Sequence, residues 1–65
     1  MDGYNKYRVC VFYGERDYEF FYIEAYDEFY AKLDAMEMYA KYSRELYYDE
    51  VLPVFSVEVE QVEEF

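Results

Sequence analysis

The residues of this chain that could do chemistry are mostly carboxylates, and many of them occur as close pairs. Four pairs stand out, namely Asp27/Glu28, Asp49/Glu50, Glu58/Glu60 and Glu63/Glu64. Two carboxyl groups can share acid and base work when they face each other across a cleft, as in glycoside hydrolysis. A domain of 65 residues offers little room for such a cleft. We therefore expect each pair to lie on a solvated edge of the molecule.

Other residues that enzymes commonly use are scarce. The sequence has no His and no Thr, and Ser43 and Ser56 are its only serines. A Ser–His–acid triad, a Cys–His pair and the common Cys/His zinc sites therefore cannot form within one chain. Gly3 and Gly14 cannot supply a glycine-rich phosphate loop, and no acidic run has the spacing of a calcium-binding loop. We expect no enzymatic activity, no cofactor and no metal site.

The charge balance limits the partners of this acidic protein. Sixteen acidic residues and six basic residues give a formal net charge of −10. Because phosphate contacts dominate nucleic-acid affinity, this charge disfavours direct binding to DNA or RNA, and it disfavours anionic membranes for the same reason. A basic surface on another protein would be attracted and steered. The acids would also keep an aromatic-rich chain soluble, and on charge alone solubility is the better explanation.

Cys10 is the only cysteine, so no disulfide can form within the chain. A lone thiol in a strand pattern is usually a small buried hydrophobic group, and it fits a reducing compartment. Residues 1–10 lack the basic region and long apolar run of a signal peptide. No apolar stretch approaches the roughly 20 residues that a membrane helix needs. We expect a cytoplasmic protein.

The elements that position these residues can be predicted from local patterns. Residues 6–13 are rich in β-branched and aromatic side chains and predict a strand. The polar segment 14–17 predicts a hairpin turn, and residues 18–25 predict the returning strand. Residues 27–46 contain no Gly or Pro and predict a helix, with Asp27 as N-cap and Arg44 near the opposite end. A loop at 47–50 precedes a last strand from 54 to 59 or 62.

These elements predict one small domain over residues 1–65, in the order ββαβ. The easiest closure places the third strand beside the first and antiparallel to it, in the spatial order 2-1-3. A parallel placement beside the second strand is the alternative. The expected fold is therefore a two-layer α+β domain, with a three-stranded, mostly antiparallel sheet and one helix packed on one face.

Alternation along the strands separates a core face from an opposite face. The expected core face carries no charge and comprises Tyr7, Val9, Val11, Tyr13, Phe21, Ile23, Ala25, Phe55, Val57 and Val59. The opposite face would hold Cys10, Phe12, Tyr18, Phe20, Tyr22 and Val54 together with Arg8, Glu24, Ser56, Glu58 and Glu60. A solvent-facing side of an antiparallel sheet is normally polar. We interpret this mixed aromatic and acidic face as an interface.

The predicted helix has two apolar stripes. The first helix stripe contains Phe29, Leu33, Met36, Ala40 and Tyr47, with Tyr30 at its flank. The second helix stripe lies nearly opposite and contains Ala31, Ala35, Met38, Tyr42 and Leu46. Because the first stripe carries the bulkier residues, we expect it to face the sheet. The second stripe would then be free for a partner or a second copy.

In size, charge and α+β plan, the chain resembles the small acidic anti-restriction and anti-CRISPR proteins of phages, some of which mimic DNA. The resemblance implies a non-enzymatic, protein-binding inhibitor of a nucleic-acid-binding protein, such as a CRISPR or restriction effector. Its carboxylates could imitate phosphates, and the candidates are Glu15, Asp17, Glu19, Glu24, Glu58, Glu60, Glu63 and Glu64. The aromatic and apolar candidates for contact with a partner are Phe12, Tyr18, Phe20, Tyr22, Ala35, Met38 and Tyr42.

The alternative is a self-associating structural or adaptor protein. Its aromatic sheet face and second helix stripe would form a homodimer interface, since a one-helix core can hardly hide eleven tyrosines and six phenylalanines. The negative charge opposes self-association, but acids at the periphery are tolerated at physiological salt. A dimer would also present the acids twice, so the two hypotheses are compatible.

Overall fold

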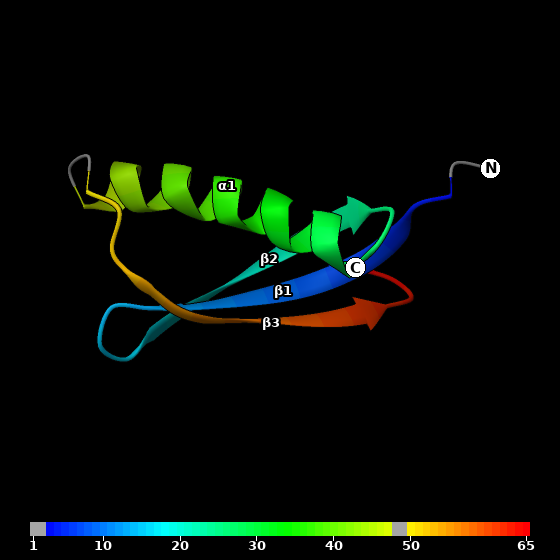
Figure 1. The fold of residues 1–65 in the computed structure, drawn as a ribbon, viewed down its shortest axis with the longest axis horizontal. Helices are drawn as coiled ribbons and strands as arrows, with labels where there is room; N and C mark the ends of the chain where they lie inside the picture. Colours follow the sequence, from blue (N-terminus) through cyan, green and yellow to red (C-terminus); the bar gives the residue numbers. More distant parts are fainter. Residues whose placement is uncertain (1–2, 48–49) are drawn as a thin grey trace.

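The computed structural model describes residues 3–47 and 50–65. The elements are β1 (Asn5–Tyr13), β2 (Asp17–Ala25), α1 (Glu28–Leu46) and β3 (Val54–Val62). The strands form an antiparallel sheet in the order β2-β1-β3, and α1 lies along one face of it (Figure 1). The expected two-layer α+β fold is confirmed, with the third strand beside the first. Within the expected 47–50 loop, residues 48 and 49 lie outside the described residues.

The β1–β2 turn is tied to the start of β3. Gly14 has a φ of 62°, in the left-handed region that residues with a Cβ avoid. Its amide donates a hydrogen bond of 3.1 Å to the Pro53 carbonyl. The glycine therefore both allows the turn and joins it to the edge strand.

The helix begins and ends as its sequence predicts. The Asp27 side chain accepts a 3.0 Å hydrogen bond from the Tyr30 amide, so Asp27 is the N-cap. Glu28 lies in the first turn and Arg44 in the last, where each charge is favourable to the helix dipole. The Tyr47 amide donates to the Ser43 carbonyl at 2.8 Å and closes the last turn.

The helix stripe that faces the sheet is the second one, so the expected orientation is wrong. Ala31 and Ala35 are fully buried and Tyr42 packs against the core, whereas Phe29 is 63% exposed and Leu33 is 47% exposed. Ala35 and Tyr42, which we expected to contact a partner, therefore belong to the core.

The physical reason lies in the sheet, which already contributes the bulky rings of Tyr7, Tyr13 and Phe21 to the core. Opposite these rings, alanines let the helix backbone approach closely, and a row of large side chains would overfill the layer. Met38, also in the second stripe, lies at its margin and remains exposed. Tyr39, which the stripe analysis did not include, is the largest fully buried side chain.

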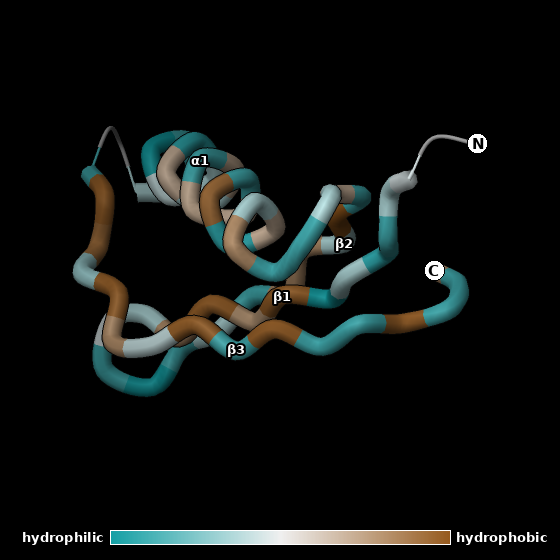
Figure 2. The backbone as a smooth tube through the Cα atoms, turned by 45° about the vertical axis from the view of Figure 1, so that its right-hand side comes forward, coloured by the Kyte–Doolittle hydropathy of each residue, from teal (hydrophilic) through white to brown (hydrophobic). Residues whose placement is uncertain are grey.

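A register shift corrects a second expectation. Hydrophobic and hydrophilic residues alternate along β3 (Figure 2), but the pairing with β1 slips between Phe12 and Tyr13. Tyr13 consequently pairs with Val54, and Phe55 is the extra residue of the irregularity. Val54 packs against the core and Phe55 is 70% exposed, the reverse of their expected faces.

Buried hydroxyl groups join α1 to the segment that precedes β3. The Tyr39 hydroxyl donates a 2.6 Å hydrogen bond to the Leu52 carbonyl. The Ser43 hydroxyl donates to the Glu50 carbonyl at 2.8 Å and accepts from the Leu52 amide at 3.1 Å. These bonds satisfy polar groups that would otherwise be costly in the core.

Candidate functional site

The sheet face that points away from α1, here called the open face, has a simple layout set by strand register. Its cross-strand rows are, from β2 through β1 to β3, Tyr18–Phe12–Ser56, Phe20–Cys10–Glu58, Tyr22–Arg8–Glu60 and Glu24–Lys6–Val62. Three aromatic residues, Tyr18, Phe20 and Tyr22, therefore form a column on β2, and the acids Glu58 and Glu60 form a column on β3. The basic side chains lie between them, on β1.

The aromatic column consists of Tyr18, Phe20 and Tyr22, which are 58%, 41% and 54% exposed. They lie on the open face as the alternation predicts. Cys10 and Phe12 occupy the same face but differ in exposure, because Cys10 is buried and Phe12 is half-buried. Both lie on the central strand, where Cys10 has the larger residues Phe20 and Glu58 on its two sides, and Phe12 has Tyr18 on one side and Ser56 on the other.

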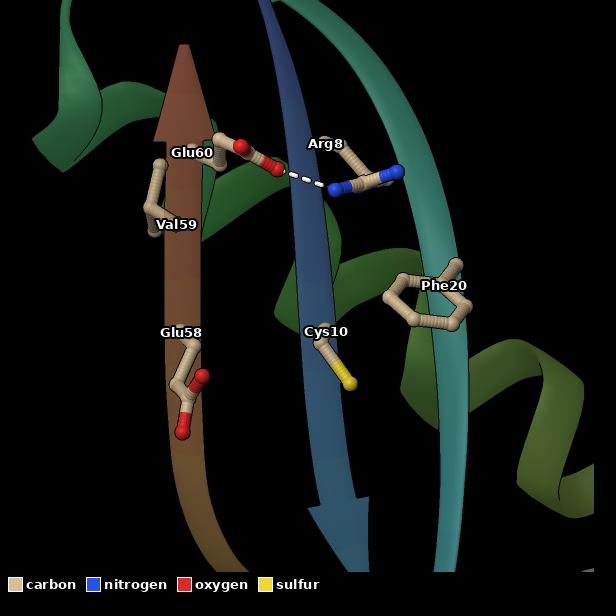
Figure 3. Close-up of a pocket in the computed structure, with 6 residues that line it drawn as sticks. All are labelled: Arg8, Cys10, Phe20, Glu58, Val59 and Glu60. Atoms are coloured by element: carbon tan, nitrogen blue, oxygen red, sulfur yellow. Dashed lines mark hydrogen bonds and ion pairs between the residues drawn. The ribbon is translucent and has the colours of Figure 1, made fainter.

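A depression of about 400 Å³ lies in the middle of the open face (Figure 3). It is lined by Arg8, Cys10, Phe20, Glu58, Val59 and Glu60. The Arg8 guanidinium forms an ion pair with Glu60 and lies 5.5 Å from the centre of the Phe20 ring. Arg8 thus connects the acidic column to the aromatic column, although an exposed ion pair of this kind stabilises a fold only slightly.

The Cys10 thiol in this depression is poorly suited to covalent chemistry. Its pKa is raised, first by burial and then by the nearby Glu58 carboxylate, against the opposing effect of Arg8. The thiol therefore stays protonated at neutral pH, and the protonated form is a weak nucleophile and metal ligand. Among residues 3–47 and 50–65, no group of three or more His, Cys, Asp or Glu side chains is placed to hold a metal ion.

The chain turns back after β3 (Figure 1), and Phe65 contacts side chains of the open face. The Phe65 ring lies 5.7 Å from the Tyr22 ring, and the Lys6 ammonium lies 5.8 Å from the centre of the Phe65 ring. Neither Phe65 nor Lys6 was predicted from the sequence to belong to the site. The exposed acids Glu63 and Glu64 belong to this returning segment.

The expected acidic residues do not form one continuous surface. Glu24, Glu58 and Glu60 share the open face, but strand alternation places Asp17 and Glu19 on the opposite side of β2. Glu19 is half-buried, and its carboxylate accepts a 3.1 Å hydrogen bond from the Phe20 amide. Asp17 and Glu19 are therefore separated by the sheet from the aromatic column of the open face.

The outer side of α1 is a second exposed apolar surface. Phe29, Leu33 and Met36 of the first helix stripe are 63%, 47% and 36% exposed. Over the described part of the chain, no helix combines the length and apolar character that crossing a membrane requires. The exposure of their large apolar side chains makes the open face and the outer side of α1 candidates for protein contact.

No protein-family model, curated protein or solved structure matches this chain.

Proposed function

We propose that this protein is a non-enzymatic inhibitor that acts in the cytoplasm by binding a nucleic-acid-binding protein, such as a CRISPR or restriction effector. The observation that carries the proposal is the open face, where an uncovered aromatic column lies across from two carboxylates on a chain of net charge −10. Exposed aromatic rings are frequent anchors of protein interfaces. Carboxylates can pair with the basic side chains that normally contact phosphates.

The acidic column suits a basic groove because its carboxylates are regularly spaced. Glu58 and Glu60 are two residues apart on one strand, so their side chains emerge on the same face at a separation of about 7 Å. Among the described residues, Arg8–Glu60 is the one ion pair, which leaves Glu58 available to a basic side chain of the partner. The exposed ring of Phe20, which shares its row, would provide the apolar part of the contact.

A competition measurement tests this proposal. A fluorescent DNA duplex is bound to a purified CRISPR or restriction effector, and displacement by the protein is followed by fluorescence anisotropy. We expect Glu58→Gln/Glu60→Gln to weaken competition by about tenfold, because the Glu58 contact with the partner is lost and the Arg8 charge is left without its carboxylate. The matched control is Glu37→Gln/Glu45→Gln, which changes the net charge equally on the exposed surface of α1. Equal losses in both variants would contradict a role for the open face.

Salt supplies an independent check on the same complex. Raising the salt concentration to about 0.5 M shortens the Debye length to roughly 4 Å, so contacts between exposed charges weaken. We expect competition to fall steeply over this range. Competition that is unchanged at the higher salt would exclude the electrostatic mechanism.

Self-association is the second candidate function, favoured by the exposure of both the aromatic column and the first helix stripe. A second copy of the chain could cover either surface. The second helix stripe no longer supports this candidate, since Ala31 and Ala35 lie in the core and Tyr42 packs against it. A homodimer would therefore use the open face or Phe29, Leu33 and Met36.

A further inference from the structure

A second pocket, here called the tyrosine pocket, lies where the end of β2 meets the N-terminal half of α1. It has a volume of about 320 Å³ and is lined by Tyr4, Glu24, Ala25, Tyr26, Tyr30 and Asp34. The six described residues of its wall include three tyrosine rings and two carboxylates, and none of the six is basic. Apart from Glu24, none of these residues takes part in the open face.

The tyrosine rings are held by contacts between separate segments of the chain. Tyr4 precedes β1, and its ring stacks on Tyr26 with centroids 4.6 Å apart and planes at 24°. Tyr26 lies between β2 and α1 and meets the Tyr30 ring edge-on, at 6.4 Å and 74°. The Asn5 side-chain amide donates a 3.1 Å hydrogen bond to the Tyr26 carbonyl and fixes this connection. The pocket is therefore already formed before any ligand binds.

The charges of the pocket favour a cation. Among the described residues, neither Glu24 nor Asp34 takes part in an ion pair. Lys6 is opposite Glu24 in the sheet register, but its ammonium lies over the Phe65 ring instead. Aromatic rings carry negative potential on their faces and attract ammonium groups, and adjacent carboxylates strengthen that attraction.

We propose that the tyrosine pocket binds the ammonium group of a lysine side chain on a protein partner. A lysine can bury its apolar stem against the rings while its charged end meets the carboxylates. Glu24 belongs to both the pocket and the open face, so a basic protein on the open face lies within reach of the pocket. The inference rests on the proposed function for the identity of the partner, whereas ammonium binding can be measured without that partner.

The test is an NMR titration of the full chain with the peptide acetyl-Gly-Lys-Gly-amide. We expect saturable shifts of the ring resonances of Tyr4, Tyr26 and Tyr30. A matched peptide carrying Nε-acetyl-lysine keeps the stem but loses the charge, and we expect it to bind about tenfold more weakly. Equal binding of the two peptides would overturn the proposal. Choline binding about tenfold more tightly than the lysine peptide would also overturn it, in favour of a free quaternary amine.

Variants separate the pocket from general charge attraction. We expect Glu24→Gln/Asp34→Asn and Tyr26→Leu each to weaken lysine-peptide binding by about fivefold or more. The control Glu37→Gln/Glu45→Gln, with the same charge change as the double variant, should bind as the unmodified chain does. Equal weakening by the two double variants would reduce the effect to net charge and contradict a specific site. The amide NMR spectrum of each variant shows whether that variant is folded. The two double variants replace only exposed side chains, so the test still holds if Tyr26→Leu does not fold.

The open-face variant distinguishes failure of this inference from failure of the proposed function. Glu58→Gln/Glu60→Gln leaves the tyrosine pocket intact, so it should bind the lysine peptide normally while losing competition with DNA. If the unmodified chain does not bind the lysine peptide, the ammonium site is excluded, but the result of the DNA competition measurement is unaffected. Peptide binding without any DNA competition would keep the ammonium site and remove the proposed inhibitor.

Discussion

The hydroxyl of Ser43 shows how much of this small fold depends on single buried contacts. It is fully buried, and it joins α1 to the segment before β3 by donating to the Glu50 carbonyl and accepting from the Leu52 amide. Ser43→Ala would leave both backbone groups without that partner. We expect it to lower the free energy of unfolding by about 1–3 kcal/mol, measured by urea denaturation.

Ser56, the other serine, provides the control because it is exposed on the open face. Ser56→Ala should change the free energy of unfolding by no more than about 0.5 kcal/mol. Similar losses from the two substitutions would show that the α1–β3 connection does not depend on the Ser43 hydroxyl.

Two neighbouring residues on β2 have opposite roles, one on the open face and one in the core. Tyr22 is 54% exposed, whereas Phe21 is 8% exposed and belongs to the core. We expect Tyr22→Ala to weaken partner binding while costing roughly 1 kcal/mol of stability or less, because it loses mainly cross-strand contacts and the contact with Phe65. Phe21→Ala should cost about 3–5 kcal/mol. Urea denaturation of the two variants, with a binding measurement on Tyr22→Ala, checks this; the reverse order of stabilities would mean that the two sheet faces are interchanged.

Among the elements, α1 owes its start to one side chain. The Asp27 carboxylate caps the Tyr30 amide, and Asp27→Ala removes that acceptor. We expect the substitution to lower the free energy of unfolding by about 0.5–2 kcal/mol in urea denaturation monitored by circular dichroism. Asp27→Asn keeps an acceptor oxygen and should be nearly neutral. A loss as large for Asn as for Ala would point to charge rather than capping as the cause.

The same elements show which parts of the structure were predictable from the sequence. Alternation, the Gly14 turn and the Asp27 cap are local patterns, and they were sufficient to predict the strands and the helix. The strand order was predicted from the easiest closure of the chain, with a parallel placement as the alternative. The register shift that exchanges Val54 and Phe55 depends on how β3 meets β1, which no local pattern records.

Tertiary packing also determined the orientation of the helix and the position of the tyrosine pocket. Both helix stripes are apolar, so choosing between them required knowing how much space the rings of the sheet leave. Tyr26 and Tyr30 are four residues apart, and this spacing alone could have suggested a ring contact near the start of the helix. The stacking of Tyr4 on Tyr26 joins residues 22 positions apart in the chain and could not be read from spacing.

For the whole molecule, buried tyrosines predict a loss of stability at alkaline pH. The pKa of Tyr13 is raised, chiefly by burial and then by the nearby Tyr42 and Tyr47 hydroxyls, and burial also raises the pKa of Tyr39. Above a pH of about 10 the unfolded chain releases these protons while the folded chain retains them. The free energy of unfolding should therefore be largest below that pH and decrease as the pH rises further.

Urea denaturation at neutral pH and at several pH values above 10 measures this decrease. Tyr13→Phe removes one of the ionisable hydroxyls from the core, so its stability should decrease less steeply with pH than that of the unmodified chain. An equally steep decrease in the variant would show that Tyr13 does not contribute to the alkaline transition.

The state of association determines which of the two exposed apolar surfaces is available to a partner. With a net charge of −10 on a chain of 8.1 kDa, copies of the chain repel each other. We expect light scattering at physiological salt to give a mass near 8.1 kDa that does not depend on concentration.

Phe20→Lys and Leu33→Lys make the same charge change on the open face and on the first helix stripe. A mass near twice 8.1 kDa that Phe20→Lys abolishes and Leu33→Lys preserves would assign the open face to a homodimer. The inhibitor proposal would then have to place its partner on another surface.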